Sequence, residues 1–286
     1  MINKVISVVA AFLTIAALAS EHPYGGITFV GTFDIEGIGL VTDHTIWPET
    51  YPTQFHARAV LPEGKQLFGY KTSHNKYTRY PLMDESLWFM PPMKSGDLMT
   101  VEAIVATAQY YVDPNPGKGS DENIGSESAP FATLQRAVNE GSTNTKEYTV
   151  IYAAPGNYTL GGATPNSSTK ARVVIDRNVR IKGAGRNVSF IHGKKDTTSG
   201  QADEYGCGPE AERCIQFTSF SETCVQGFTI CNGYSGLSSP TPTDAQKGGI
   251  IAKGIQNHIV DSIISNCYGY TCTAAYCGSF VRTLIT

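Results

Sequence analysis

Basic residues gather in one stretch of the sequence, where they could bind an anionic ligand. The range 170–195 holds eight lysines and arginines against one acid, Asp176. Alternation with Val179 and Ile181 predicts that the basic residues between and beside them point outward from a strand. A guanidinium fork suits carboxylate or sulfate groups. We therefore predict contact with an acidic or sulfated polysaccharide, although outward charges can also serve solubility alone. The candidate residues are Arg177, Arg180, Lys182 and Arg186.

Cysteines form a second group that could do chemistry. All seven lie between Cys207 and Cys277. Zinc sites usually pair cysteines in a Cys-x2-Cys pattern, and no such pair occurs here, so the spacing predicts no metal site. Cys207 and Cys214 flank a short polar loop and are our first candidates for a disulfide. Buried free thiols inside the fold are the alternative.

Histidines and tryptophans in the first third of the chain indicate no metal site. His44, His56 and His74 are too widely separated in sequence to form a compact ligand pair on a strand or helix. Trp47 and Trp88 could form a platform for sugar rings. Two tryptophans in a region of this size more often belong to the hydrophobic core, and we expect them there.

Composition divides the chain into two parts. Residues 20–108 contain no cysteine and show short alternating stretches such as 27–30 and 55–60, punctuated by proline and glycine. This pattern predicts a small β-rich domain. The segments 59–70 and 98–105 resemble repeat modules of bacterial surface proteins, which implies a spacer or attachment role. From 109 onward the sequence changes character.

The second part begins with a helical pattern followed by a strand. Leu134, Ala137 and Val138 fall on one helical face, with Thr133 as a suitable N-cap. The residues 148–158 then read as a strand that ends in a proline-glycine turn. The segment from Tyr111 through this turn resembles the entry of right-handed parallel β-helix proteins of the pectate-lyase-like group. The resemblance implies an all-β solenoid over 109–286, with the short helix covering its first rung.

Recurring strand segments fit such a solenoid. The stretch 225–232 aligns with 259–266, and Val260 aligns with Val281 at a shorter offset. Three short strands and their turns fit the shorter offset as one rung, and we interpret the longer offset as a rung with an inserted loop. Asn232 and Asn266 fall at equivalent positions after a strand. We predict a ladder of stacked asparagines there, although asparagine is also common in turns.

The segment 1–19 resembles a signal peptide. Lys4 precedes an apolar stretch, which ends in Ala17-Leu18-Ala19, the small-residue pattern of a cleavage site. We expect cleavage after Ala19 and export to the cell surface or medium. No membrane span is expected afterwards, because no later apolar stretch is long enough to cross a bilayer. A formal net charge of −3 disfavours nucleic acid as a partner.

The sequence predicts an exported, bacterial-type β-helix protein that binds polysaccharide or serves as a surface or adhesin-type module. The alternative is a polysaccharide lyase or glycoside hydrolase whose active-site rungs are missing from this chain. Thr286 aligns with Ser265 inside a rung, so we expect a C-terminally truncated fragment. The sequence matches neither the catalytic pattern of such a lyase nor that of such a hydrolase, and no catalytic residue is assigned. We predict no cofactor for the binding protein, while a lyase would use calcium. Nothing in the pattern indicates an oligomeric state.

Overall fold

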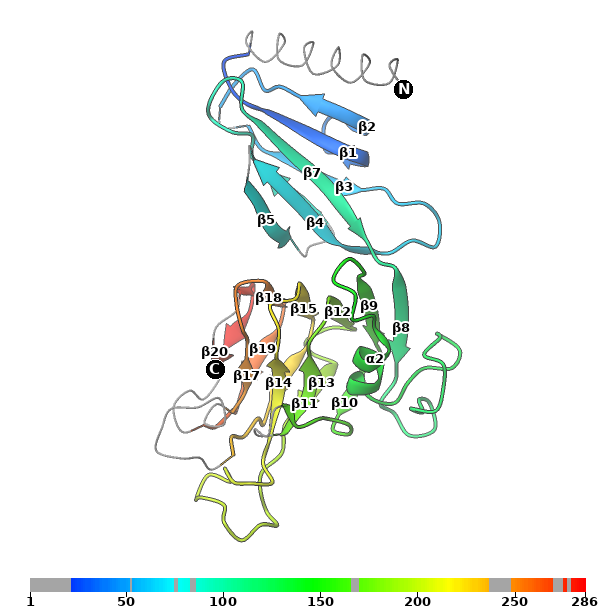
Figure 1. The fold of residues 1–286 in the computed structure, drawn as a ribbon, viewed down its shortest axis with the longest axis vertical. Coiled ribbons are helices and arrows are strands. Elements are labelled where there is room, and N and C mark those ends of the chain that lie inside the picture. Colours follow the sequence, from blue (N-terminus) through cyan, green and yellow to red (C-terminus); the bar gives the residue numbers. More distant parts are fainter. Residues whose placement is uncertain are drawn as a thin grey trace. The chain divides into compact units, whose positions relative to one another are not determined.

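The protein divides into two compact units, Met1–Val105 and Ala106–Thr286. The computed structural model describes residues 22–51, 53–74, 77–82, 86–165, 170–236, 248–269, 275–276 and 279–286. Figure 1 shows both units, each of which is described by itself below. The predicted signal peptide, residues 1–19, lies outside the described residues.

The first unit is a seven-stranded sheet with the strand order β5-β4-β7-β1-β3-β6, in which β2 pairs with β1. Strands β1 and β7 are parallel, and the other pairs are antiparallel. Alternation along β1 places Phe29, Phe33 and Ile35 in one hydrophobic core. The strands are β1 (Gly26–Ile35), β2 (Gly39–Ile46), β3 (Phe55–Ala59), β4 (Leu67–His74), β5 (Tyr77–Leu82), β6 (Leu87–Phe89) and β7 (Leu98–Val105).

The second unit is a right-handed parallel β-helix, as the sequence predicts (Figure 1). The chain passes through three parallel sheets in turn, and each circuit adds one rung. The first sheet contains β8 (Ala108–Val112), β9 (Thr149–Ala153), β12 (Val179–Gly183), β15 (Thr223–Gln226), β18 (Asn257–Val260) and β21 (Ser279–Val281). The second contains β10 (Gly156–Tyr158), β13 (Ser189–His192), β16 (Thr229–Cys231), β19 (Ile263–Ser265) and β22 (Leu284–Ile285). The third contains β11 (Lys170–Ile175), β14 (Glu212–Phe217), β17 (Ile250–Ile251) and β20 (Ala275–Tyr276).

The register between rungs confirms both alignments predicted from the sequence. Val225 pairs with Ile259, and Val260 pairs with Val281. Single residues in the left-handed conformation follow three strands of the first sheet. Gly227, Asp261 and Arg282, with φ of 77°, 47° and 47°, follow equivalent strands of the first sheet. A left-handed residue turns the chain sharply, and side chains other than glycine adopt it at a cost.

The interior of the coil is a single apolar cluster that runs through the rungs. One short helix, α2 (Leu134–Glu140), contributes Leu134, Ala137 and Val138 to it. Thr133 is the N-cap, as predicted, because its side chain accepts a hydrogen bond from the backbone N–H of Arg136. In the described part of the chain, no helix has the length and apolar character needed to cross a membrane.

Candidate functional site

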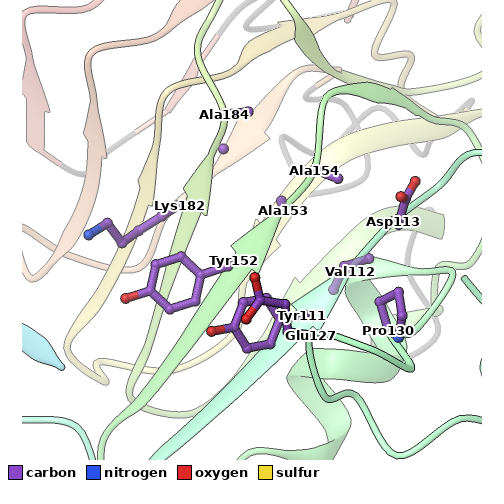
Figure 2. A pocket seen from close by; sticks show the side chains of 11 residues that line it. Tyr111, Val112, Asp113, Glu127, Pro130, Tyr152, Ala153, Ala154, Lys182 and Ala184 are labelled. Atoms are coloured by element: carbon purple, nitrogen blue, oxygen red, sulfur yellow. The ribbon is translucent and has the colours of Figure 1, made fainter. Parts of the chain in front are cut away.

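A groove lies on the second unit along the ends of β8, β9 and β12. Its volume is about 390 Å³, and one side is open to solvent (Figure 2). Strand geometry explains which side chains reach it, since successive residues point to opposite faces. Ile151 and Ile181 point into the core, and their neighbours point outward. The lining residues are Tyr111, Val112, Asp113, Glu127, Pro130, Tyr152, Ala153, Ala154, Lys182, Gly183 and Ala184.

Two tyrosines and a lysine form a column across three rungs of the groove. Tyr111 is in register with Tyr152, and Tyr152 with Lys182. The two rings lie 5.3 Å apart between centroids, with 25° between their planes. Both tyrosines are half-buried and line the groove, so part of each ring is accessible there. Lys182 Nζ lies 5.4 Å from the centroid of the Tyr152 ring, within the range of a cation–π contact.

A carboxylate occupies the other end of the groove. Figure 2 shows Asp113 on the far side of the tyrosine pair from Lys182, and Glu127 also lines the groove. Asp113 accepts hydrogen bonds from the backbone N–H and side-chain amide of Asn115, at 2.9 and 2.7 Å. Glu127 is exposed. The groove therefore offers a cation at one end, a carboxylate at the other, aromatic surface between them, and a second carboxylate from Glu127.

The predicted basic strip does not form one surface. Lys182 lines the groove, and Arg186 is exposed beyond the end of β12. Arg180 was expected to be exposed, and this is wrong: its side chain is fully buried, and Nη2 donates to Gln226 Oε1 at 2.8 Å. It points away from the coil interior as predicted, but its neighbours across the sheet, Val150 and Cys224, are buried as well.

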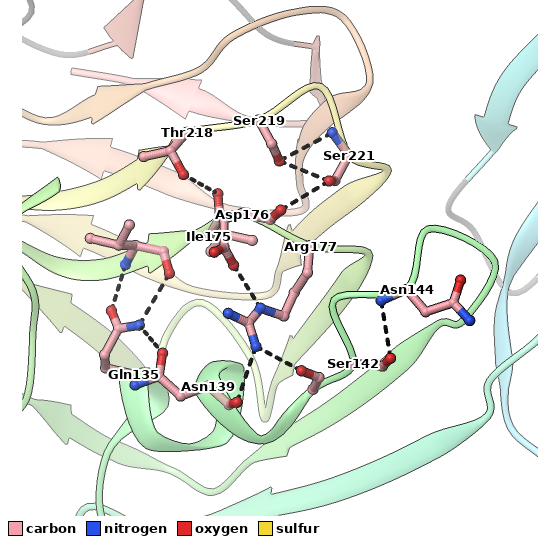
Figure 3. A network of polar contacts seen from close by, with 12 residues as sticks. Gln135, Asn139, Ser142, Asn144, Ile175, Asp176, Arg177, Thr218, Ser219 and Ser221 are labelled. Carbon is pink, nitrogen blue, oxygen red and sulfur yellow. Dashed lines mark hydrogen bonds and ion pairs between the residues drawn. The ribbon is translucent and has the colours of Figure 1, made fainter. Parts of the chain in front are cut away.

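Arg177 of the predicted strip holds the end of helix α2 instead of facing a ligand. Its Nη1 donates to the carbonyl oxygens of Asn139 and Gly141, at 3.0 and 2.7 Å, and its Nε donates to Asp176 at 2.6 Å (Figure 3). Carbonyl groups at a helix C-terminus lack partners within the helix and carry partial negative charge. The role of Arg177 is therefore structural.

Replacing Arg177 with alanine is expected to lower the free energy of unfolding by about 1–3 kcal/mol, because two charge-assisted hydrogen bonds to the end of α2 and one to Asp176 are lost. Arg186→Ala is the matched control, since this exposed arginine comes from the same predicted strip, and its effect should stay within about 0.5 kcal/mol. Chemical denaturation followed by far-ultraviolet circular dichroism measures both. Equal effects of the two substitutions would contradict the structural role of Arg177.

The predicted disulfide between Cys207 and Cys214 is not formed, and both residues are buried free thiols. Their surroundings explain the difference. Cys214 belongs to the core cluster of the coil, and its Sγ donates to the carbonyl oxygen of Cys231 at 3.1 Å. Cys207 lies in a separate small cluster with Ala211 and Tyr234. The other described cysteines, Cys224, Cys231 and Cys267, are also buried and free, whereas Cys272 and Cys277 lie outside the described residues.

Burial suppresses ionisation of the Cys214 and Cys231 thiols. It raises the pKa of Cys214, and it raises the pKa of Cys231 to about 11, with a smaller contribution from Cys267. A reactive cysteine needs a lowered pKa and access to solvent. Cys214 and Cys231 are therefore packing residues. Among the described residues, no group of three or more histidine, cysteine or acidic side chains could hold a metal ion.

Asn232 and Asn266 occupy equivalent rung positions, directly after β16 and β19. Both adopt the left-handed conformation, with φ of 58° and 49°. The side-chain amide of Asn232 lies 3.2 Å from His192 Nδ1, on the preceding rung. His192 Nε2 in turn lies 3.0 Å from Asn157 Oδ1. The hydrogen bonds of Asn232 thus run toward His192, while its stacking against Asn266 stays a prediction.

Solved structures with partial similarity to this chain include a pectin methylesterase mutant in complex with a hexasaccharide, and the pectin methylesterase PemA from Erwinia chrysanthemi. Sequence identity is 17% and 16%, with TM-scores of 0.39 and 0.40. Each match covers 64% of this chain and 50% of the other, so this chain matches only half the length of these structures. No curated protein matches the sequence.

The fold and the groove thus define a parallel β-helix protein with an open aromatic groove on one sheet. Within this class, residues 117–279 match the family described as "Protein of unknown function (DUF1565)", and the chain belongs to it. The matched range includes Glu127, Tyr152 and Lys182 of the groove, whereas Tyr111 lies just before it.

Sequence reasoning identified Lys182 but missed the tyrosine pair. Tyr111 and Tyr152 both lie in segments that support the resemblance to β-helix proteins, yet their pairing was not visible. The offset between them is longer than the two offsets that set the expected period, from Val225 to Ile259 and from Val260 to Val281. One usable signal existed: both tyrosines come directly before an apolar residue that ends a strand.

Proposed function

We propose that the protein binds a polysaccharide in the groove of its second unit, with sugar rings packed against Tyr111 and Tyr152. The main observation that supports this proposal is the column of Tyr111, Tyr152 and Lys182 along an open groove. A pyranose ring has an apolar face of C–H groups, which suits an exposed aromatic face, and a rim of hydroxyl groups. Binding sites of this kind combine aromatic surface with a few placed polar groups.

The charged groups at the two ends of the groove suggest the kind of sugar. Asp113 and Glu127 are acceptors for sugar hydroxyls, because ionised carboxylates only accept hydrogen bonds. Lys182, next to the Tyr152 ring, favours a carboxylate or sulfate group on the sugar bound there. An acidic polysaccharide with free hydroxyl groups satisfies both ends, and we propose this class of ligand.

The cellular setting is part of the proposal. A cleaved signal peptide at residues 1–19 would export the protein, where it would act as a surface or adhesin-type module on such a polysaccharide. The support is the sequence pattern of this segment. The open side of the groove suits a binding role, because a long polymer can lie along it without threading through an enclosed cavity.

The test is affinity electrophoresis of the full chain in gels that contain pectate, alginate or a sulfated glycan, with neutral xylan as reference. Retardation by at least one acidic polysaccharide is expected. Tyr152→Ala should weaken binding by about tenfold or more, which corresponds to about 1.4 kcal/mol. Lys182→Gln should reduce the preference for acidic over neutral polysaccharide, since it removes the charge and keeps much of the side chain.

Tyr205→Ala is the matched control, because this tyrosine is 56% exposed on the second unit and does not line the groove. Its binding should equal that of the wild type. Unretarded migration in every gel, or equal retardation of wild type and Tyr152→Ala, would overturn the proposal.

A further inference from the structure

The first unit carries an exposed row of polar and aromatic side chains on β1, β3 and β6. His56 is opposite Trp88 across the β3–β6 pair, and Arg58 is opposite Asp34 across the β1–β3 pair. Glu36 follows β1 and reaches His56. A cavity of about 400 Å³ lies beside this row, and Trp88 reaches it only through its stacking on His56. The cavity is lined by Asp34, Glu36, His56, Ala57, Arg58 and Ser86.

Trp88 is the unusual residue of this row, because 61% of it is exposed. The expectation that it belongs to the core is wrong. Its strand neighbour Phe89 points inward and is buried, so alternation turns Trp88 to the outer face. Single exposed apolar side chains are common on protein surfaces, and Trp88 is informative because it stacks on His56, which lines the cavity.

The indole of Trp88 rests on a ring that is held in place. The rings of His56 and Trp88 are stacked, with centroids 4.7 Å apart and 21° between planes. His56 is bound at both ring nitrogens: Nδ1 lies 3.1 Å from Glu36 Oε2, and Nε2 lies 3.0 Å from Ser86 Oγ. A ring fixed at both nitrogens loses little freedom when a ligand binds, which is the benefit of preorganisation.

The charges beside this platform favour an uncharged ligand. Arg58 donates through Nε and Nη2 to Asp34 Oδ2, at 3.1 and 3.0 Å, so its charge is compensated. Glu36 adds a further negative charge, and 69% of its side chain is exposed. In the groove, Lys182 lies on the far side of the tyrosine pair from Asp113, whereas here the arginine is bound directly to Asp34 and Glu36 lies beside them. Because like charges repel, an anionic polymer is disfavoured at this platform. The carboxylates can accept hydrogen bonds from hydroxyl groups.

We infer that the Trp88–His56 platform is a second binding site of the protein, specific for an uncharged saccharide. The apolar face of one sugar ring packs on the indole, and Glu36 and Asp34 accept hydrogen bonds from hydroxyl groups of a neighbouring sugar in the same chain. This site lies in a different unit from the groove and differs in its ligand, so it does not rest on the proposed function. The lining of the groove contains no tryptophan, so tryptophan fluorescence can report on the Trp88 site separately from the groove.

Tryptophan fluorescence tests this site, because the chain contains only two tryptophans, Trp47 and Trp88. The full-length Tyr152→Ala variant is titrated with hexasaccharides of glucan, xylan, mannan and galactan. At least one is expected to change the emission saturably. The further substitution Trp88→Phe should abolish that change, while Trp47→Phe should keep it.

Two more variants test whether the fixed His56 ring contributes to binding. Ser86→Ala releases one side of the His56 ring and should weaken the titration about two- to fivefold, as expected for a loss of preorganisation. Leu40→Ala is the matched control, because Leu40 is 70% exposed on β2 of the same unit and does not line the cavity. It should leave the titration unchanged. The inference is overturned if no hexasaccharide changes the emission, or if the change survives in Trp88→Phe.

Discussion

Replacing Phe228 with alanine is expected to lower the free energy of unfolding of the second unit by about 3–5 kcal/mol. The ring is completely buried in the core cluster of the coil. It meets the Tyr158 ring edge-on, with centroids 5.9 Å apart and 75° between planes. It also packs closely against the backbone of Gly183, where an added Cβ would come within 2.9 Å of it. Removing the ring leaves a cavity between rungs that hydrogen-bonded strands can close only in part.

Chemical denaturation followed by far-ultraviolet circular dichroism measures the effect of Phe228→Ala. The matched control is Phe220→Ala, since this phenylalanine is 67% exposed in the same unit, and its effect should stay within about 0.5 kcal/mol. A loss below about 1 kcal/mol for Phe228→Ala would mean that the core at this rung is not packed as described.

Phe228 illustrates what the sequence could predict. It lies in the stretch 225–232, whose alignment with 259–266 set the register of two rungs correctly. Alternation and repetition can both be seen in the sequence itself, because buried parallel strands must stack apolar residues on apolar residues. The coil, helix α2 and its N-cap at Thr133 follow from such patterns.

Arg180 and Trp88 show where pattern reasoning stops. Alternation correctly turned Arg180 away from the coil interior, but the direction of a side chain does not reveal whether it is covered, and Arg180 is buried. Trp88 was assigned to a core from its residue type, although its strand position decides the matter. Cys207 and Cys214 are close in sequence, yet they belong to different apolar clusters.

To predict the groove from the sequence, the long-range pairing of the strands would have to be known. Lys182 and Tyr152 are brought together by the parallel register of β9 and β12, and Tyr111 joins through β8. The segment between β8 and β9 contains a long loop and helix α2, so no repeat length predicts which residues stack. The aromatic column therefore emerges only when the rungs are assembled.

A largely buried ion pair between β11 and β14 gives the last prediction. Arg172 and Glu212 lie on adjacent rungs, with Nη2 and Oε2 2.5 Å apart and side-chain exposures of 6% and 14%. Arg172 also donates to the carbonyl oxygens of His192 and Gly161, both at 2.9 Å. Burial lowers the pKa of Arg172, and the charge of Glu212 opposes this shift. The pair thus stabilises a charge that the surroundings alone would disfavour.

Arg172→Met should lower the free energy of unfolding by about 3–5 kcal/mol, because it leaves the Glu212 carboxylate buried without a partner. The double variant Arg172→Met/Glu212→Leu should recover much of this loss, since two apolar side chains remove the need to desolvate charges. Lys170→Met/Glu210→Leu is the control, because that pair is about half exposed and contributes little. Denaturation by urea measures all three. If the double variant at Arg172 and Glu212 were no more stable than Arg172→Met, the hydrogen bonds of Arg172 to the backbone would be the main source of stability, and not the ion pair.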